Sequence, residues 1–568
     1  MSLLEQRRLE VAQMTGSLQP DSFHNLFFQQ AEKYAQQEFL CSNYTKLTYE
    51  ETQSAVERLA LGLSNLGIST DEENISLIFP NYAELIIAKL SASVLGKVTV
   101  PLNYRLNKNE MGYLVNQSDS VCIITIDKWR NSNYIKMLRE ICPEVFEGKR
   151  SEQFPYLRNI IVYSPEGNKY EGTHDFYDLI EGADAQEATQ FATNLLTSQI
   201  RDVEGLSDIM YTSGTTSLPK GVLVTHDMVW RAALGSCINR GYQKGRRIYI
   251  PIPLYHCFGY IVGLVGATMV GGAVILQEDF DEMEALQLIR DFKVDDMLCV
   301  PTIAIRLLKS LRDQNQPLQL EAMYCAGAEV PITLWKELKE VAGIQQLITG
   351  YGMTELAGGV LQADPEDELS YLVRYVGKTI PGGHVGLDDL NGCNIEFKIR
   401  DIESREFLSF GQEGELVCRG PIVTKGYYKK EAETAKAFED GWLNTGDLAV
   451  LHENGYVTLT GRLKEIYRIG AENVAPKEIE EVFTSHPEVN QAYVVGVPDT
   501  LLGEVGLAWI VLEERSALTE DDLMKFVSEK LARFKVPKYI QIVEEHKLPK
   551  TATGKIQKFK LKEIYTQA

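Results

Sequence analysis

The sequence lacks an excess of basic residues. It has 57 Lys and Arg against 79 Asp and Glu over 568 residues, a formal net charge of −22. Non-specific nucleic-acid binding normally needs a basic face, so nucleic acid is not an expected partner. There is no long low-complexity tract, and the 44% apolar and 24% charged content is typical of a globular chain. The length predicts at least two domains, and leaves an enzyme and a large scaffold equally open.

Cysteine pairs with metal-finger or redox spacing are also missing. The nine cysteines are scattered through apolar stretches, which predicts buried, reduced thiols in a reducing compartment. The N-terminal stretch MSLLEQRRLEVAQMTG has no apolar core of a secretory signal, and the C-terminal stretch KEIYTQA carries no lipidation or organelle signal. These absences predict a cytoplasmic protein.

No apolar run is long enough for a clear membrane span. Residues 260–277 carry no charge, but the stretch is short for a span and is broken by glycines. A helix, a Gly-Gly turn and a buried strand AVIL fit it better, so no integral membrane span is expected.

What the sequence does contain is an alternation of helical and strand-like patterns over residues 46–130 and again over 206–350. Such alternation predicts an α/β fold with two mostly parallel sheets. From about 375 to 460 the pattern changes to short strands and turns, which predicts a β-rich subdomain. The last hundred residues read as a small α+β unit. Its stretch 525–568 has eleven Lys and Arg against four Asp and Glu, which fits either a solvated face or a lid over an anionic ligand.

Residues 211–221, YTSGTTSLPKG, form the most informative segment. A loop rich in Ser, Thr and Gly after a strand can offer backbone N–H groups and hydroxyls to phosphate oxygens, and Lys220 adds positive charge. The Walker pattern requires Ser or Thr after the lysine, whereas Gly221 follows Lys220. By composition alone, such a loop is most often a simple turn.

This loop and further motifs, in order from YEE at 49–51 to GKIQK at 554–558, resemble the ANL superfamily of adenylate-forming enzymes. That superfamily includes acyl-CoA synthetases, adenylation domains and luciferases, and the resemblance is strongest to acyl-CoA synthetases of the medium-chain or fatty-acid type. It implies a large N-terminal AMP-binding domain over residues 1–461, with the β-rich subdomain inside it. A small mobile C-terminal lid over residues 462–568 would follow.

The resemblance implies ATP and Mg²⁺ as ligands of the loop. Ser217 departs from the usual glycine of the family without removing a phosphate ligand. Thr216 and Glu355 are the implied Mg²⁺ ligands, since hard oxygen donors suit a hard cation. The implied phosphate ligands are Thr212, Ser213, Gly214, Thr215, Thr216 and Lys220.

Two further motifs are similar to the family's nucleotide-binding pair, AGAE at 326–329 and GYGMTE at 350–355. Tyr351 would offer a flat face to adenine, and Thr354 would donate a hydrogen bond to the α-phosphate. Seen alone, the second motif also fits a strand–turn–helix junction with Thr354 as its cap. The implied adenine-side residues are Gly327, Ala328, Glu329, Gly350, Tyr351, Gly352 and Met353.

The element PLYH, ending at His256, resembles the family's PxxH motif and would place His256 near the substrate carboxylate. Without the other motifs, a core histidine beside a Pro-rich turn is the simpler interpretation. By resemblance, the acyl pocket is lined by mostly apolar or small residues, which suits an aliphatic acid of medium to long chain or an aryl acid. Glycines at 352 and 358 either open a long channel or serve backbone geometry. The pocket candidates are Cys257, Phe258, Tyr260, Tyr324, Ala357 and Gly358.

GWLNTGD, ending at Asp447, and Arg462 resemble the ribose-binding elements. Lys464 falls at the family's hinge, where a residue absorbs backbone change between two closed states. Where CoA ligases often have a Gly-Gly pair, this chain has Gly470-Ala471, so the thiol acceptor is less clearly specified. The CoA-side candidates are Arg468, Gly470, Ala471 and Glu472.

PKTATGK, ending at Lys555, resembles the terminal catalytic element of the family. Lys555 would neutralise charge as the acid attacks the α-phosphorus. Without the motif it would be one more surface lysine. His256, Thr354, Glu355 and Lys555 form the predicted catalytic set.

The resemblance therefore implies an ATP-dependent acyl-CoA synthetase that forms acyl-AMP and pyrophosphate and then transfers the acyl group to CoA. A free-standing carrier protein is the second candidate for the acceptor. The sequence also leaves open a non-catalytic nucleotide-binding relative and a luciferase-like oxidative use of the adenylate. A monomer or homodimer is expected.

Overall fold

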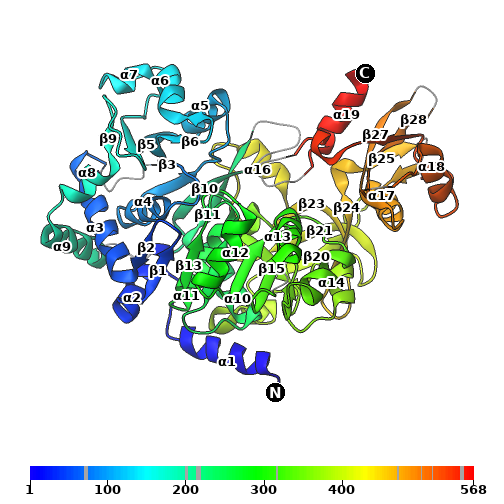
Figure 1. Ribbon diagram of the computed structural model, residues 1–568, viewed down its shortest axis with the longest axis horizontal. Helices are drawn as coiled ribbons and strands as arrows, with labels where there is room; N and C mark the ends of the chain where they lie inside the picture. The colour runs from blue at the N-terminus through cyan, green and yellow to red at the C-terminus, as the bar shows by residue number, and fades with distance from the viewer. Residues whose placement is uncertain are drawn as a thin grey trace. The chain divides into compact units, whose positions relative to one another are not determined.

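The computed structural model describes residues 1–68, 74–198, 202–212, 219–314, 317–469, 472–499, 502–514, 516–550 and 556–567. These residues form two compact units (Figure 1). The first holds the described residues of 1–212, 219–396 and 419–436, and the second holds those of 397–418 and 437–567. Much of the predicted β-rich subdomain therefore contributes to the second unit. The predicted domain boundary at 461/462 stays a prediction.

One sheet of the first unit has the strand order β16-β15-β14-β12-β13-β1-β2. Among the described residues, neighbouring strands of this sheet are parallel, except that β1 and β2 are antiparallel. The strands are β16 (Gln346–Ile348), β15 (Ala322–Cys325), β14 (Asp296–Cys299), β12 (Arg247–Ile250), β13 (Ala273–Leu276), β1 (Glu38–Cys41) and β2 (Lys46–Thr48).

A second sheet of the same unit has the order β11-β10-β4-β3-β5-β8-β9. In the part of this sheet that the structure describes, β10 and β11 are antiparallel and the other neighbouring strands are parallel. The prediction of two mostly parallel sheets is thus confirmed. The strands are β11 (Lys220–Thr225), β10 (Leu206–Thr212), β4 (Val98–Pro101), β3 (Asn74–Ile78), β5 (Ser120–Ile126), β8 (Asn159–Tyr163) and β9 (His174–Asp175).

Helices connect these strands in the predicted rhythm. The helix α3 (Tyr49–Asn65) illustrates why the sequence forms them: Thr48 accepts a hydrogen bond from the N–H of Glu51, whose carboxylate accepts from the N–H of Thr48. The other α-helices of the first unit are α1 (Leu3–Thr15), α2 (Phe23–Tyr34), α4 (Ala83–Val94), α5 (Lys108–Gln117), α6 (Tyr134–Ile141), α7 (Pro143–Phe146), α8 (Phe176–Glu181), α9 (Ala185–Ser198), α10 (His226–Arg240), α11 (Gly266–Met269), α12 (Glu282–Asp291), α13 (Pro301–Gln314), α14 (Ile332–Glu340), α15 (Leu369–Arg374) and α16 (Glu431–Ala437).

The uncharged stretch from residue 260 onward is helical and then extended, as predicted. The π-helical stretch η1 (Phe258–Val265) continues into α11, and β13 follows the Gly271-Gly272 turn. A Cβ at Gly272 would lie 2.2 Å from the carbonyl oxygen of Arg246, so a residue without a side chain is required there. Within the described ranges, no helix combines the length and apolarity needed to cross a membrane.

Short strands complete the first unit. The antiparallel set β17 (Gly350–Met353), β18 (Gly358–Gln362) and β19 (Lys378–Thr379) follows β16, with the 3-10 turn η2 (Thr354–Leu356) between β17 and β18. The hairpin β6 (Lys128–Trp129) and β7 (Ser132–Asn133) precedes α6.

The second unit contains two further sheets. The first joins β20 (Glu396–Arg400), β21 (Glu413–Arg419), β23 (Trp442–Leu451), β22 (Phe438–Glu439) and β24 (Val457–Arg462), confirming the short strands expected before residue 460. The second joins β26 (Glu472–Val474), β25 (Tyr467–Ile469), β28 (Gly503–Leu512), β27 (Val489–Asp499) and β29 (Tyr539–Ile542).

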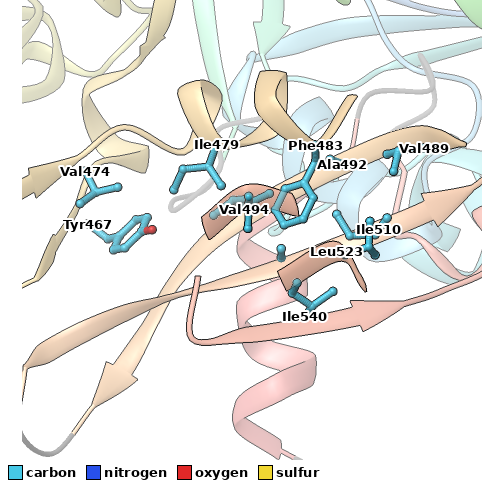
Figure 2. Packing of buried hydrophobic residues seen from close by; sticks show 12 residues of the cluster. Tyr467, Val474, Ile479, Phe483, Val489, Ala492, Val494, Ile510, Leu523 and Ile540 are labelled. Carbon is cyan, nitrogen blue, oxygen red and sulfur yellow. The ribbon is translucent and has the colours of Figure 1, made fainter. Parts of the chain in front are cut away.

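Apolar side chains at helical spacing explain how the last helices pack. Helix α17 (Pro476–Thr484) begins with a proline at its first turn, where no backbone N–H is needed. Its Ile479 and Phe483 are fully buried against Val494 and Ile510 of the neighbouring strands (Figure 2). The remaining α-helices of this unit are α18 (Glu520–Ser528) and α19 (Lys558–Gln567).

Candidate active site

Three predicted motifs follow the carboxyl ends of parallel strands in one sheet. The PLYH element follows β12, the AGAE element follows β15, and the GYGMTE element follows β16. Ligands of open α/β sheets bind at the carboxyl ends of the strands. The topology therefore brings these three motifs to one edge of the sheet.

The predicted phosphate loop joins β10 to β11. Thr212 is the last residue of β10 and pairs with Lys220, the first residue of β11. Both residues are thus held by the two strands at the mouth of this connection. Ser213, Gly214, Thr215 and Thr216 lie outside the described residues, and so does the Ser217 departure.

A segment that the sequence analysis did not single out, Thr424–Tyr428, lies along β11. The N–H of Leu223 donates to the carbonyl of Gly426, and the N–H of Tyr428 donates to the carbonyl of Gly221, at 3.0 and 2.8 Å. This pairing places Tyr427 beside Lys220, whose Nζ lies 4.1 Å from the centre of the tyrosine ring.

Glu355, the predicted Mg²⁺ ligand, also contacts Tyr427. The tyrosine hydroxyl donates to Glu355 Oε1 at 3.0 Å, and the N–H of Thr424 donates to the backbone carbonyl of Glu355 at 2.8 Å. The glutamate is buried. Within the described residues, no group of three or more His, Cys, Asp or Glu side chains forms a metal site. Mg²⁺ bound to a nucleotide needs only one or two protein oxygens besides the phosphates, so Glu355 fits such an ion.

Thr354 contacts the first acyl-pocket candidate. Burial raises the pKa of the Cys257 thiol to about 11, and a hydrogen bond with the Thr354 side chain opposes that rise. The Cys257 thiol is therefore protonated near neutral pH, which suits the role predicted for it in an apolar pocket.

The segment that leads to His256 is held by a residue that follows a strand of the other sheet. Asn81, which follows β3, donates to the carbonyls of Ile250 and Ile252 and accepts from the N–H of Leu254, at 3.1, 2.9 and 2.9 Å. The surrounding protein lowers the pKa of His256 to about 4 by desolvation. His256 is therefore a neutral imidazole at physiological pH, able to donate and accept hydrogen bonds.

Tyr324 and Phe258 pack together among the acyl-pocket candidates. Their rings meet edge to face, with centres 4.9 Å apart. A Cβ at Gly350 would lie 2.1 Å from the Tyr324 hydroxyl, and one at Gly359 would lie 2.5 Å from it. The tyrosine therefore fills the space beside both glycines.

The glycines at 352 and 358 serve backbone geometry. A Cβ at Gly352 would lie 1.6 Å from the carbonyl oxygen of Gly358, which no side chain permits. Gly358 has φ of +117°, a conformation that L-residues rarely adopt. Ala357, just before it, is buried and closes the turn with φ of +55°. These observations support the backbone-geometry interpretation of both glycines.

Tyr260, another acyl-pocket candidate, contacts residues outside the predicted motifs. Its ring meets Phe23 edge to face, with centres 5.8 Å apart, and Lys89 Nζ lies 4.0 Å from the ring centre. Lys89 forms a buried ion pair with Asp208. Tyr260 thus belongs to a buried polar cluster under β10.

The predicted adenine-side residues follow β15 and form β17. Gly327, with φ of +89°, and the adjacent Ala328 and Glu329 are exposed. Tyr351 is buried and its hydroxyl donates to Met353 Sδ at 3.8 Å. These residues are placed at the strand ends where a nucleotide would be expected.

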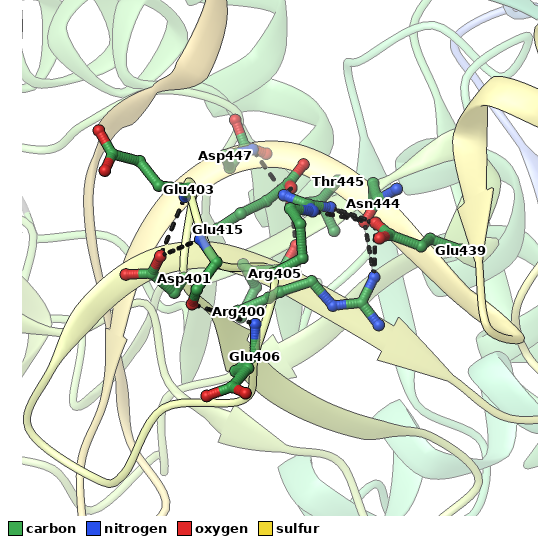
Figure 3. A network of polar contacts seen from close by, with 12 residues as sticks. Arg400, Asp401, Glu403, Arg405, Glu406, Glu415, Glu439, Asn444, Thr445 and Asp447 are labelled. Atoms are coloured by element: carbon green, nitrogen blue, oxygen red, sulfur yellow. Dashed lines mark hydrogen bonds and ion pairs between the residues drawn. The ribbon is translucent and has the colours of Figure 1, made fainter.

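In the second unit, the two predicted ribose ligands are partners. Arg462 Nε lies 2.9 Å from Asp447 Oδ1, and the residues face each other across β23 and β24. A polar network lies on the same sheet: Arg405 and Arg400 both contact Glu439, and the N–H of Asp447 donates to Thr445 (Figure 3).

The predicted hinge and CoA-side residues follow β24. Lys464 lies in the 3-10 turn η5 (Leu463–Glu465) and is exposed, as is Arg468 in β25. Glu472 is the first residue of β26. Gly470 and Ala471 lie outside the described residues. The hinge and CoA-side roles stay predictions.

Lys555 lies outside the described residues, but the residues on either side of 551–555 are paired. Lys550 pairs with Ile556, and the N–H of Gln557 donates to the carbonyl of Pro549 at 2.8 Å. Lys558 then contacts two carboxylates, Glu465 at 2.7 Å and Glu480 at 2.8 Å.

Acidic partners accompany much of the basic stretch 525–568. The pairs are Lys535–Glu478, Lys538–Asp499, Lys547–Glu544, Lys550–Glu545, Lys558–Glu465 and Lys562–Glu504. These lysines are held by carboxylates of their own unit, so the formal charge of the stretch overstates the charge that it offers to a ligand.

Sequence reasoning missed Asn81, Tyr427 and Lys558. Asn81 follows Pro80, and Tyr427 follows Gly426. The proline and the glycine predict loops, but no sequence motif marks either neighbouring residue as part of a site. In the sequence, Lys558 is only one lysine of a basic stretch. Long-range contacts give all three their importance.

Comparisons with known proteins find similar sequences and structures over most of the chain. The AMP-binding enzyme family matches residues 27–428, and the AMP-binding enzyme C-terminal domain matches residues 478–555. The Bacillus subtilis (strain 168) protein YngI, which carries the name of an acyl-CoA synthetase, is 33% identical over 531 residues, covering 91% of this chain and 92% of that protein. The medium-chain acyl-CoA ligase ACSF2, mitochondrial, of Danio rerio is 30% identical over 525 residues, covering 91% of this chain and 83% of that protein. The O-succinylbenzoate CoA synthetase (MenE) from Bacillus subtilis, solved with ATP and magnesium ion, has a TM-score of 0.76 and 25% identity over 95% of this chain and 99% of that one.

Proposed function

The chain belongs to the AMP-binding enzyme family and is an acid–thiol ligase of that family, and from this premise we propose that it is an acyl-CoA synthetase for medium-chain aliphatic acids. It would activate the acid with ATP as acyl-AMP and then pass the acyl group to the thiol of CoA. The observation that carries the nucleotide part is the convergence of Lys220 and Glu355 on Tyr427. A cation for phosphate and a carboxylate for Mg²⁺ are what ATP activation requires.

The substrate proposal is supported by the apolar packing beside the site. Phe258 and Tyr324 offer aromatic surface, and Cys257 is a protonated thiol. Apolar walls favour an alkyl or aryl tail. Tyr324 fills the space beside Gly350 and Gly359, which favours a medium chain over a long one. The name of the Danio rerio relative points to the same chain length.

In the first half-reaction, a carboxylate oxygen would bond to the α-phosphorus of ATP while the bond to pyrophosphate breaks. Thr212 and Lys220 would bind phosphate oxygens, and Thr354 would donate to the α-phosphate. Lys555 would neutralise the negative charge that builds up between acid and phosphate. Mg²⁺, when bound by Glu355 and Thr216, would supply further neutralisation of the phosphate oxygens. Neutral His256 would orient the acid through a hydrogen bond and would not form an ion pair with its carboxylate.

In the second half-reaction, the thiol sulfur would bond to the acyl carbon, AMP would leave with the electron pair, and the thiol would lose its proton. Asp447 and Arg462 would hold the ribose through both steps. Lys464 would be the hinge that exchanges Lys555 for the face bearing Arg468, Gly470, Ala471 and Glu472. Cytoplasmic location and a monomeric or homodimeric state remain predictions, and the Danio rerio relative is named mitochondrial.

Acid-dependent exchange of pyrophosphate into ATP tests the substrate proposal. Straight-chain acids from butyrate to stearate and a set of aryl acids, including benzoate, are compared by kcat/KM. We expect the maximum at a medium-chain acid. A maximum at stearate or at an aryl acid would contradict the proposed acid. If none of the acids in the panel supported exchange, a non-catalytic nucleotide-binding relative would be favoured.

A further inference from the structure

Tyr427 contacts both charged groups of the proposed phosphate site through different parts of its side chain. Its hydroxyl donates to Glu355 Oε1 at 3.0 Å, and Lys220 Nζ lies 4.1 Å from its ring centre. The residue is buried, with 8% of its surface exposed. It therefore meets the predicted metal ligand with its polar end and the predicted phosphate ligand with its ring.

The backbone around Tyr427 is fixed by elements on both sides. Tyr427 bridges to Val222 of β11, and its own N–H donates to the Thr434 hydroxyl in α16 at 3.0 Å. Thr424, three residues earlier, donates from its N–H to the carbonyl of Glu355. These contacts hold the backbone of Tyr427 next to β11, the strand that begins with Lys220.

We propose that Tyr427 is a positioning residue that sets the Glu355 carboxylate for Mg²⁺ and the Lys220 ammonium for the ATP phosphates. This inference rests on the proposed function. The phenol holds one carboxylate oxygen, which fixes the rotation of the group and the direction in which its other oxygen points. The negative face of the ring holds the ammonium. Tyr427 thus positions the Glu355 carboxylate with its hydroxyl and the Lys220 ammonium with its ring.

Two variants separate the two contacts. Tyr427→Phe keeps the ring and removes the hydroxyl, whereas Tyr427→Leu removes both. The adjacent Tyr428→Phe is the matched control, because the Tyr428 hydroxyl also donates to a carboxylate, that of Asp119 at 2.9 Å, which is outside the predicted site. Each full-length variant is titrated with ATP by calorimetry at a series of Mg²⁺ concentrations and without Mg²⁺.

We expect Tyr427→Phe to raise the Mg²⁺ concentration for half-maximal ATP binding about tenfold, the effect of losing one hydrogen bond to a charged group, with ATP binding in the absence of Mg²⁺ unchanged. Tyr427→Leu should weaken ATP binding in both conditions. Tyr428→Phe should match the wild-type chain. An unchanged Mg²⁺ requirement in Tyr427→Phe, or equal losses in Tyr427→Phe and Tyr428→Phe, would overturn the inference. Failure of the wild-type chain to bind ATP would instead overturn the proposed function.

Discussion

Asp447 and Arg462 form an ion pair, with Arg462 Nε 2.9 Å from Asp447 Oδ1. The aspartate side chain is only 7% exposed, while that of the arginine is 44% exposed. Their pairing across β23 and β24 orients the carboxylate before any ligand arrives. Preorganisation of this kind lowers the cost of binding, which supports the ribose role proposed for both residues.

Asp447→Asn keeps the shape of the side chain and removes its charge. We expect an increase of about tenfold or more in KM for ATP, since a carboxylate accepts from ribose hydroxyls more strongly than an amide does. Thermal stability should change little, because an ion pair with an exposed partner contributes roughly 0–1 kcal/mol.

The matched control for that variant is Glu439→Gln on the same sheet. Glu439 is shared by Arg405 and the buried Arg400 (Figure 3). Loss of the Glu439 charge should lower the free energy of unfolding through its contacts with Arg400 and Arg405 without changing KM for ATP. If Asp447→Asn instead behaved like Glu439→Gln, the ribose role of Asp447 would be excluded.

Lys555→Ala should separate the two half-reactions. We expect acid-dependent pyrophosphate exchange to fall about a hundredfold or more, as when one charge-stabilising group is removed from a transition state. Conversion of supplied acyl-AMP and CoA to acyl-CoA should stay near the wild-type rate. Normal exchange in the variant would refute the role proposed for Lys555.

Lys558→Met should destabilise the second unit. Lys558 is largely buried between Glu465 and Glu480, and Glu480 also accepts from the N–H of Val494 at 2.6 Å. Removing one partner of a buried ion pair typically costs about 3–5 kcal/mol. Urea unfolding followed by intrinsic fluorescence measures the loss.

Lys562→Met is the control on the same helix. Its pair with Glu504 is 3.0 Å long and its side chain is 42% exposed, so a change of roughly 0–1 kcal/mol is expected. Equal unfolding curves for the two variants would show that burial of Lys558 does not matter.

Stability should decrease with acid through His24. This side chain lies between the hydroxyls of Ser22 and Ser93, at 3.1 and 2.7 Å, and burial lowers its pKa from 6.5 to about 3. The unfolded chain therefore takes up a proton below pH 6.5 that the folded chain does not, so stability is lost as the pH falls below that value. At about pH 5 the loss from one such group is about 2 kcal/mol.

His24→Gln removes that contribution while keeping hydrogen-bonding groups. Urea midpoints at about pH 7.5 and about pH 5 should differ less for the variant than for the wild-type chain. An equal difference in both chains would show that His24 does not drive the acid sensitivity.

The sequence predicts the fold best where local signals agree. The helix at Tyr49–Asn65 has apolar periodicity, a threonine cap and a glycine soon after its end. The short strands before and after Ala83–Val94 are rich in Ile, Leu and Val and are fully buried. Local propensity and burial point to the same elements there. The sequence leaves the roles of the glycines at 352 and 358 open, because only the packed structure shows that a backbone carbonyl or the turn itself excludes a side chain.

The site is less predictable, because its supports come from distant parts of the chain. Asn81 holds the His256 element from another sheet, and Tyr427 joins Lys220 to Glu355 across more than seventy positions. An asparagine after a strand and a tyrosine in a loop belong to no sequence motif that would predict a functional role. The sequence makes Tyr260 a pocket candidate because it follows the PLYH motif, and only the structure shows its contacts with Phe23 and Lys89.

The most direct test of the central claim is AMP release by the wild-type chain, measured with ATP, Mg²⁺ and a medium-chain acid, in the presence and absence of CoA. The account predicts slow or single-turnover AMP release without CoA, and sustained release with CoA that matches acyl-CoA formation mole for mole. Adenylate formation with no CoA-dependent turnover would contradict it and would favour a carrier protein as the acceptor.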